Sequence, residues 1–155
     1  MILIKPMQAQ HLDAVYEIEC ASFTTPWSKE SLLREITENE HAVYVVAMLF
    51  EAFRDPMVVG YAGMWHVADE GHITNLAVKP RYREKGVAST ILANLSEFAA
   101  KRGISAITLE VRVGNITAQK LYAKHGFAVE GLRKGYYADT GEDAYIMWKN
   151  LNTSS

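Results

Sequence analysis

The sequence predicts a single mixed α/β domain in which about seven strands form a central sheet and about four helices flank it. The chain has 155 residues, the size of one ordinary domain. Its hydrophobic fraction of 49% and charged fraction of 22% are those of a folded globular protein. Stretches with a two-residue apolar period alternate with stretches of helical period, and neither a repeat nor a linker separates them. We therefore expect one domain over residues 1–151 and a short disordered tail over residues 152–155.

The first half of the chain is expected to begin with a strand and two helices. Ile2 and Ile4 alternate with their neighbours before Pro6, which is typical of a short strand. Ser28 precedes an amphipathic stretch and is a good N-cap for a helix. The expected elements are a strand at 2–5, helices at 8–21 and 29–38, an antiparallel strand pair at 42–50 and 57–66, and a further strand at 71–78.

The second half is expected to contain a β-α-β unit. Val87, Ile91, Leu95 and Phe98 recur at near-helical intervals, and Gly103 follows where glycine commonly ends a helix. A strand on each side of this helix makes the central unit of the fold. The expected elements are a helix at 87–102, a strand at 104–113, a short helix at 118–125 and strands at 127–131 and 144–151.

The composition excludes several classes of protein. A net charge of −2 does not suit a protein coated with basic residues for nucleic acid. Cys20 is the only cysteine, so it predicts neither an internal disulfide nor a cysteine-rich zinc site. No apolar run approaches the length of roughly 20 residues that a membrane-spanning helix needs. We expect a cytoplasmic protein with no metal, no membrane association and no direct contact with nucleic acid.

The turn between the third long strand and the central helix has the features of a phosphate site. Lys79, Arg81, Arg83 and Lys85 make this turn basic, and the helix begins at Gly86. The first N–H groups of a helix have no partner within it, and the helix dipole makes that end positive. Phosphate therefore binds readily there. By itself the pattern also fits a solvated basic turn, and it is neither a Walker loop nor a dinucleotide fingerprint.

The spacing Arg83-x-x-Gly86-x-Ala88, after a strand ending Leu76-Ala77-Val78, resembles the Q/R-x-x-G-x-G/A element of the GCN5-related N-acetyltransferases. The resemblance implies acetyl-CoA as cosubstrate. It implies that main-chain groups of Leu76, Ala77 and Val78 pair with the pantetheine arm like an added strand. The same resemblance assigns the pyrophosphate to the turn that holds Arg83, Glu84, Lys85, Gly86, Val87, Ala88 and Ser89.

Three further residues gain a role only from the same resemblance. Alternation within 104–113 places Glu110 on the face opposite the apolar residues, which alone fits a surface carboxylate paired with a cation. Tyr122 alone fits a core residue whose hydroxyl reaches the rim, and Asn115 alone fits a helix cap. Residues 109–127 together resemble the second half of the acetyltransferase core. The resemblance implies that Glu110 is the general base, Tyr122 the general acid and Asn115 a cofactor contact.

Two aromatic segments resemble one subgroup, the RimI-type ribosomal-protein-alanine N-acetyltransferases. These segments are Phe23-x-x-Pro26-Trp27-Ser28 and Arg133-x-x-Tyr136-Tyr137. The resemblance implies transfer of acetyl to the N-terminal α-amine of a protein, the N-terminal alanine of a small-subunit ribosomal protein, by direct attack in a ternary complex. We expect the peptide to lie between two walls, although each aromatic residue fits a core plug equally well. The wall residues are Phe23, Trp27, Tyr136 and Tyr137.

The chemistry of the reaction suits these assignments. A protein α-amine titrates near 7.7–8.0, so little driving force is needed for Glu110 to remove its proton, directly or through one water. The main-chain N–H of Val78 is expected to bind the thioester oxygen as charge develops on it. Cys20 is expected to be half-buried on a helix, which disfavours an acyl-enzyme route. We expect the protein to be a monomer or a weak homodimer.

Three alternatives remain open from the sequence. The same fold could acetylate a small-molecule amine such as a polyamine, for which Asp139, Glu142 and Asp143 would supply an acidic pocket. It could bind acetyl-CoA as a non-catalytic module, which the presence of both Glu110 and Tyr122 argues against. A nucleic-acid binder is the weakest of the three, because the basic cluster is only a few residues long.

Overall fold

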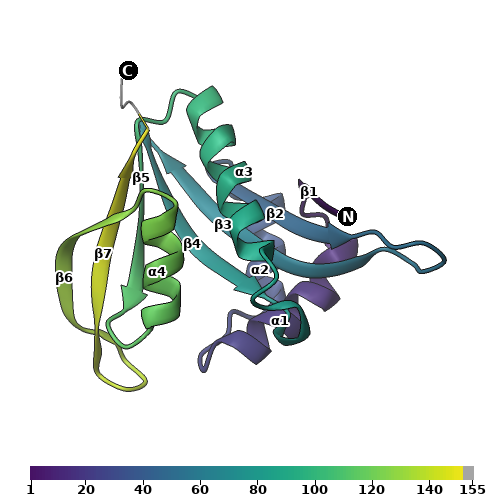
Figure 1. The fold of residues 1–155 in the computed structure, drawn as a ribbon, viewed down its shortest axis with the longest axis horizontal. Coiled ribbons are helices and arrows are strands. Elements are labelled where there is room, and N and C mark those ends of the chain that lie inside the picture. Colours follow the sequence, from purple (N-terminus) through teal and green to yellow (C-terminus); the bar gives the residue numbers. More distant parts are fainter. Residues whose placement is uncertain (152–155) are drawn as a thin grey trace.

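Seven strands form one sheet in this computed structural model, which describes residues 1–151. They are β1 (Ile2–Pro6), β2 (Ala42–Leu49), β3 (Met57–Val67), β4 (Glu70–Val78), β5 (Ala106–Arg112), β6 (Ala128–Tyr137) and β7 (Glu142–Asn150). Their order in the sheet is β1-β2-β3-β4-β5-β7-β6 (Figure 1). Only β4 and β5 pair in parallel; the other neighbours are antiparallel. The mixed sheet predicted from the sequence is confirmed, and the predicted tail at 152–155 lies outside the described residues.

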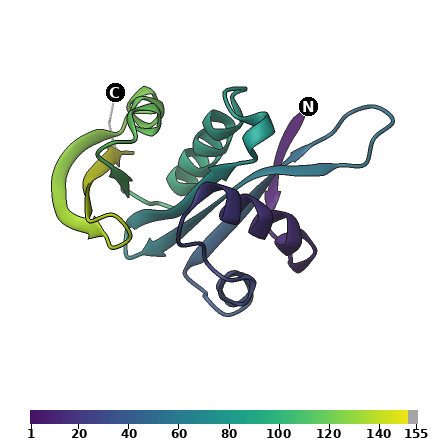
Figure 2. The ribbon, with the colours of Figure 1, turned by 90° about the horizontal axis from the view of Figure 1, so that it is seen from below.

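Two pairs of helices cover opposite faces of this sheet. They are α1 (Leu12–Ser22), α2 (Lys29–Thr37), α3 (Val87–Lys101) and α4 (Ile116–Lys124). Figure 2 shows α1 and α2 on one side of the sheet, with α3 and α4 on the other. Each side has its own apolar core: Ile91, Leu95 and Ile107 belong to the first, and Val15 and Leu32 to the second. No helix among residues 1–151 is both long enough and apolar enough to span a membrane.

The structure corrects several predicted boundaries. The helix predicted at 8–21 begins as a 3-10 turn, Ala9–His11, before α1 starts at Leu12. The helix predicted at 118–125 starts at Ile116, because the side chain of Asn115 caps it by accepting a hydrogen bond from the N–H of Ala118 (3.1 Å). The strand predicted at 127–131 continues to Tyr137 as β6. Most side chains of β6 are exposed, so alternation did not mark this strand, and pairing with β7 defines it.

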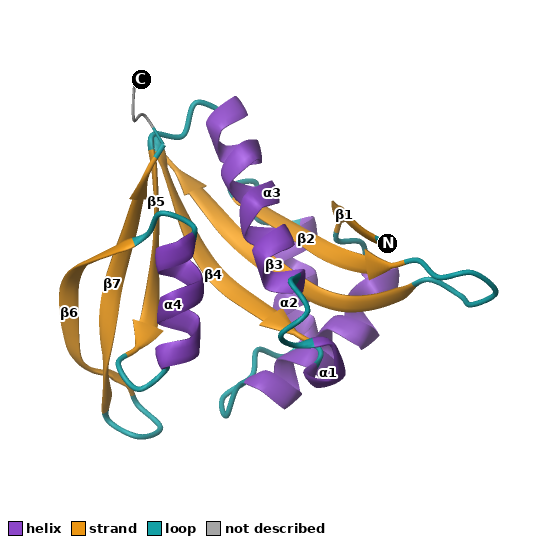
Figure 3. Cartoon of the chain, viewed as in Figure 1, coloured by secondary structure: helices purple, strands orange, loops and turns teal. Residues whose placement is uncertain are grey.

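The feature that creates a site is the divergence of β4 and β5. Only residues 70–72 of β4 pair with β5, where their partners are residues 106–108. Beyond His72 the two strands separate, as Figures 1 and 3 show. A shift of register between Gly63 and Met64 of β3 marks a bulge opposite this point of β4. The sheet therefore opens between its two halves, and the edge of β4 facing β5 has no strand beside it from residue 73 onward.

Candidate active site

A cleft of about 1370 Å³ lies where the sheet opens. It is bordered by β4, β5, the start of α3, α4, the segment between α1 and α2, and the turn between β6 and β7. All predicted site residues line it except Lys85, whose ammonium lies 5.6 Å from the ring centre of Tyr82. The predicted residues that line the cleft are Phe23, Trp27, Leu76, Ala77, Val78, Arg83, Glu84, Gly86, Val87, Ala88, Ser89, Glu110, Asn115, Tyr122, Tyr136 and Tyr137.

The start of α3 presents unpaired N–H groups to open space. Gly86 is its N-cap, with φ at 84°, a left-handed conformation that favours glycine. The first bond inside the helix runs from the N–H of Thr90 to the carbonyl of Gly86 (3.0 Å). The N–H groups of Val87, Ala88 and Ser89 precede it and have no partner within the helix. A Cβ placed on Gly86 would meet no atom within 4 Å, so the space beside these donors is open to a phosphate.

Arg83 holds this turn in place. Its Nε donates to the carbonyl oxygen of Val78 (3.0 Å), and its Nη2 donates to the hydroxyl of Ser22 (3.1 Å). One side chain thus connects the turn before α3 to the end of β4 and to the end of α1. These two contacts fix the turn that leads to Gly86 without any ligand.

Glu110 lies in the cleft with two cationic or polar partners. Its Oε2 is 2.7 Å from Nε2 of His72, and its Oε1 is 3.7 Å from Nε of Arg133. The hydrogen bond from His72 is the main cause that lowers the pKa of Glu110 below its ordinary value, against the opposing effect of burial. Because its pKa is lowered, the carboxylate is ionised at neutral pH. Its side chain is 12% exposed and lines the cleft, so a substrate can reach it.

Sequence reasoning gave His72 no role. The parallel register sets His72 opposite Thr108, and Glu110 is two residues further along the same face of β5. The pair joins residues 38 positions apart in the chain, so it depends on the register between the two strands. The two-residue period of each strand was readable in the sequence, but the offset between them was not.

Tyr122 lies on α4 beside the cleft. Burial raises the pKa of its phenol to about 12, so the hydroxyl remains protonated at neutral pH. Its ring packs edge to face against Phe127, with centroids 5.9 Å apart. Asn115, the predicted cofactor contact, caps the same helix and so also fixes where Tyr122 is presented.

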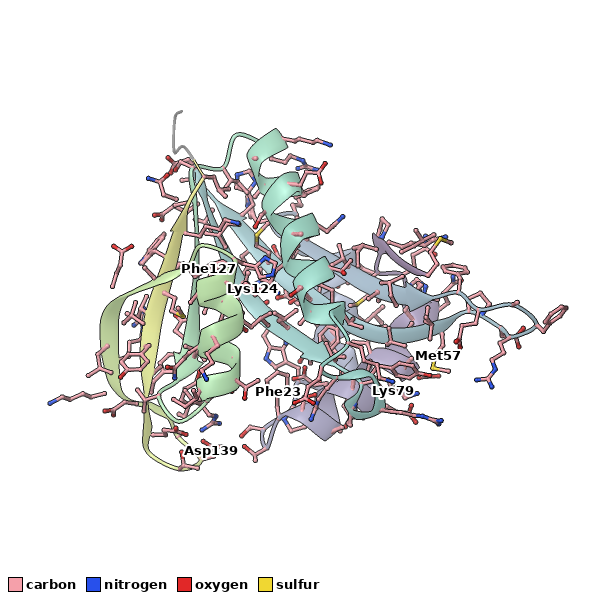
Figure 4. All side chains as sticks on the ribbon, viewed as in Figure 1. Phe23, Met57, Lys79, Lys124, Phe127 and Asp139 are labelled. Atoms are coloured by element: carbon pink, nitrogen blue, oxygen red, sulfur yellow. The ribbon has the colours of Figure 1, made fainter. Side chains whose placement is uncertain are left out.

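Aromatic side chains stand on both sides of the cleft mouth. Phe23 is 39% exposed, and Tyr136 packs edge to face against Tyr137 with centroids 5.0 Å apart. Figure 4 shows Phe23 and Asp139 at the same end of the gap between the two halves of the molecule. The hydroxyl of Thr24 donates to the carboxylate of Asp139, which joins the two walls directly.

Arg112 organises the wall made by the β6–β7 turn. Its Nη2 donates to Asp139 (2.9 Å), its Nη1 donates to Glu142 (3.3 Å), and its guanidinium carbon lies 3.9 Å from the ring centre of Tyr137. The hydrogen bond from Thr24 and then that from Arg112 lower the pKa of Asp139 to about 2. These contacts link the turn to β5, the strand that carries Glu110.

The exposure of Cys20 differs from the prediction. The residue was expected to be half-buried, but it is exposed on α1 and is not among the residues that line the cleft. Cys20 lies on the same exposed side of α1 as Glu17, three residues earlier, so helical position did not imply burial. The conclusion that this thiol is no acyl carrier now rests on its position outside the lining of the cleft. Within residues 1–151, no group of three or more His, Cys, Asp or Glu side chains is arranged to hold a metal ion.

Comparison with known proteins identifies the fold and the family. The family model of the GNAT acetyltransferases matches residues 12–127. The chain belongs to the GNAT acetyltransferase family. A crystal structure of the ribosomal-protein-S18-alanine N-acetyltransferase from Escherichia coli, 29% identical, superposes with a TM-score of 0.86 over 100% of this chain and 97% of that one. The single-domain α/β fold of this GNAT protein is thereby shown.

Relatives of known sequence point to one subgroup of GNAT enzymes. A candidate [ribosomal protein bS18]-alanine N-acetyltransferase from Bacillus subtilis is 42% identical over 149 residues, covering 96% of this chain and 95% of the relative. The [ribosomal protein bS18]-alanine N-acetyltransferase of Escherichia coli strain K12 is 32% identical over 149 residues, covering 95% and 96%. The predicted resemblance to the RimI-type enzymes is confirmed, and GNAT enzymes use acetyl-CoA.

Proposed function

We propose that this GNAT enzyme transfers the acetyl group of acetyl-CoA to the N-terminal α-amine of a protein, the N-terminal alanine of ribosomal protein bS18. The observation that carries the proposal is the position of Glu110, held by His72 in the cleft where β4 and β5 separate. The ribosomal substrate comes from the relatives that match nearly the whole chain.

The residues that would hold acetyl-CoA fit it. The N–H groups of Val87, Ala88 and Ser89 would bind the pyrophosphate in the open space beside Gly86. The edge of β4 facing β5 is unpaired from residue 73 onward, so Leu76, Ala77 and Val78 would pair with the pantetheine arm. The arm would then lead the acetyl group toward the point where the strands meet.

Glu110 is suited to remove the proton of the attacking amine. The α-amine titrates near 7.7–8.0, so a fraction is neutral at pH 7 and a carboxylate, directly or through one water, completes the deprotonation. As the nitrogen bonds to the carbonyl carbon, a main-chain N–H on the unpaired edge of β4 would stabilise the oxygen on which charge develops. The N–H of Val78, expected from the sequence to do this, lies instead at the pyrophosphate end of the arm, beside Arg83. A lysine side chain has a pKa near 10.4, so a far smaller fraction of it is neutral at pH 7 and its deprotonation by the same carboxylate would be much less favourable.

Tyr122 is suited to the other end of the reaction. When the C–S bond breaks, its electron pair stays on sulfur, and the phenol donates its proton to the leaving thiolate. Its pKa of about 12 keeps the proton in place until that moment. The products are the amide and free coenzyme A. Glu110 holds the proton taken from the amine and Tyr122 is left as a phenolate, so transfer of one proton from Glu110 to Tyr122 through solvent restores both groups. The ternary complex therefore needs no acyl-enzyme.

The acidic pocket that a polyamine substrate would need is not free. Asp139 and Glu142 both accept hydrogen bonds from Arg112, and Asp143 accepts one from the N–H of Gly135 (2.8 Å). Their charges stabilise the β6–β7 turn and are partly neutralised there. The small-molecule alternative therefore loses the feature that suggested it.

The proposed function predicts the position of the acetyl group on a peptide. Peptides with an N-terminal alanine and an internal lysine, incubated with enzyme and acetyl-CoA, should gain one acetyl group on the α-amine, as measured by tandem mass spectrometry. The same peptides with a blocked N-terminus are the control and should gain none. Acetylation of the lysine alone, or of polyamines in preference to peptides, would contradict the proposal.

Tyr122→Phe is expected to lower kcat by about 100-fold, in the lower range of the contribution of a general acid. The substitution keeps the ring contact with Phe127, so the fold should be unaffected. Steady-state release of thiol measures kcat, and calorimetry measures the Kd of acetyl-CoA, which should change little. An unchanged kcat would show that the phenol does not serve the leaving sulfur.

A further inference from the structure

Glu19 is a buried carboxyl group with no role in the chemistry described above. It lies on α1, is 1% exposed, and is surrounded by uncharged donors. Its Oε2 accepts the N–H of Trp27 (2.9 Å), and its Oε1 accepts the hydroxyl of Tyr61 and faces Nδ2 of Asn75 at 3.5 Å. Burial raises the pKa of Glu19. Burying a carboxyl group without a cation is costly, so its position calls for a reason.

The partners of Glu19 belong to three separate elements. Trp27 is in the segment between α1 and α2, Tyr61 is in β3, and Asn75 is in β4. Tyr61 is fully buried and Asn75 is 5% exposed, so both are fixed parts of the sheet. Glu19 and Asn75 also line the cleft. One side chain therefore attaches the segment between the helices to the strand that borders the cofactor path.

That segment has few other attachments. In the part of the chain that the structure describes, residues 24–27 are held by the hydrogen bond of Thr24 to Asp139 and by that of Trp27 to Glu19. The first is at the exposed mouth of the cleft, and the second is buried beneath it. The segment carries Phe23 and Trp27, which form one wall of the proposed peptide site. Its inner end is held by this hydrogen bond to Glu19 together with the packing of the Trp27 side chain against the second apolar core.

We propose that Glu19 is a positioning residue for the protein substrate, because it fixes the main chain of Trp27 against β3 and β4 and so gives the incoming N-terminus a preformed wall. This inference rests on the proposed function. It assigns Glu19 no contact with the reacting atoms. Preformed walls lower the ordering cost of binding, so losing this contact should weaken peptide binding more than cofactor binding.

The test compares Glu19→Ala, Glu19→Gln and the matched control Glu17→Ala, whose side chain is exposed on the same helix. In Glu19→Ala, the KM for an alanine-terminated peptide should rise about 10-fold, the effect of losing one buried hydrogen bond. The Kd of acetyl-CoA should stay within about twofold, and the Trp27 amide should lose protection from hydrogen exchange. Glu19→Gln should restore a near-normal KM, because its amide oxygen accepts the same N–H. Glu17→Ala should behave as wild type.

Three outcomes would overturn the inference: a normal peptide KM in folded Glu19→Ala, an equal loss of acetyl-CoA affinity, or a Glu19→Gln enzyme as impaired as Glu19→Ala. If Glu19→Ala does not fold, Glu19→Asp carries the test, because its shorter side chain draws the carboxylate away from Trp27; its KM should rise while its Kd for acetyl-CoA does not. A wild-type enzyme that leaves α-amines unmodified would instead contradict the proposed function, so the two failures are distinguishable.

Discussion

Replacing Glu110 with glutamine is expected to lower kcat by about 100- to 10,000-fold, the usual contribution of a general base. Glutamine has the same shape and can still accept the hydrogen bond of His72, so the fold and the cleft should survive. It cannot take a proton from the amine. Thiol release under saturating peptide and acetyl-CoA measures kcat, and a loss below about threefold would exclude Glu110 as the base.

The pH profile provides a control for this assignment. The hydrogen bond of His72 lowers the pKa of Glu110, so this carboxylate stays ionised at and above the ordinary pKa of glutamate. The enzyme should therefore lose activity on the acid side only as the pH falls through this lowered pKa. Between pH 6 and 8, kcat/KM of the wild type should rise only with the neutral fraction of the α-amine. In His72→Ala the opposing effect of burial remains, so the pKa of Glu110 should rise and the acid limb should move to higher pH. An unmoved acid limb would contradict the coupling.

Gly86→Val is expected to weaken acetyl-CoA binding by about 10-fold or more. A β-branched residue at a φ of 84° is strained by roughly 1–3 kcal/mol, and its side chain would occupy the open space beside the N–H groups of α3. Calorimetry with coenzyme A measures the Kd directly, without any need for turnover.

Gly103→Val is the matched control for this substitution. Gly103 follows the other end of α3, has φ at 78°, and also has open space around its Cβ position. Both variants should therefore lose stability by a similar amount, which thermal unfolding measures. Only Gly86→Val should lose cofactor affinity. Equal losses of affinity would mean that backbone strain, rather than the phosphate site, explains the effect.

Local patterns in the sequence predicted much of this enzyme. The two-residue period of β5 put Glu110 on the face opposite Ile107 and Leu109, and the structure has the same alternation of burial. The basic turn ending at Gly86 predicted the start of α3 to within one residue. These features depend on residues close in the chain, where spacing alone decides which side chains share a face.

Local patterns failed where the surroundings define an element. β6 is long but almost wholly exposed, so it shows no apolar period, and its hydrogen bonds to β7 determine its extent. Cys20 lies in a helix, but whether that side of the helix is covered depends on what packs against it. The resemblance to GNAT enzymes supplied roles for Glu110, Tyr122 and Asn115 that spacing alone did not.

The sequence by itself determined the order of strands and helices, the glycine turn at the start of α3 and the face on which Glu110 lies. Only the tertiary structure decided that β4 and β5 separate after His72, that His72 meets Glu110, that Asp139 joins Thr24, and that Glu19 anchors Trp27. The reason is physical. Helical and strand periods are set by neighbours along the chain, whereas contacts between residues 8 to 115 positions apart depend on strand register and on how the two halves of the sheet diverge.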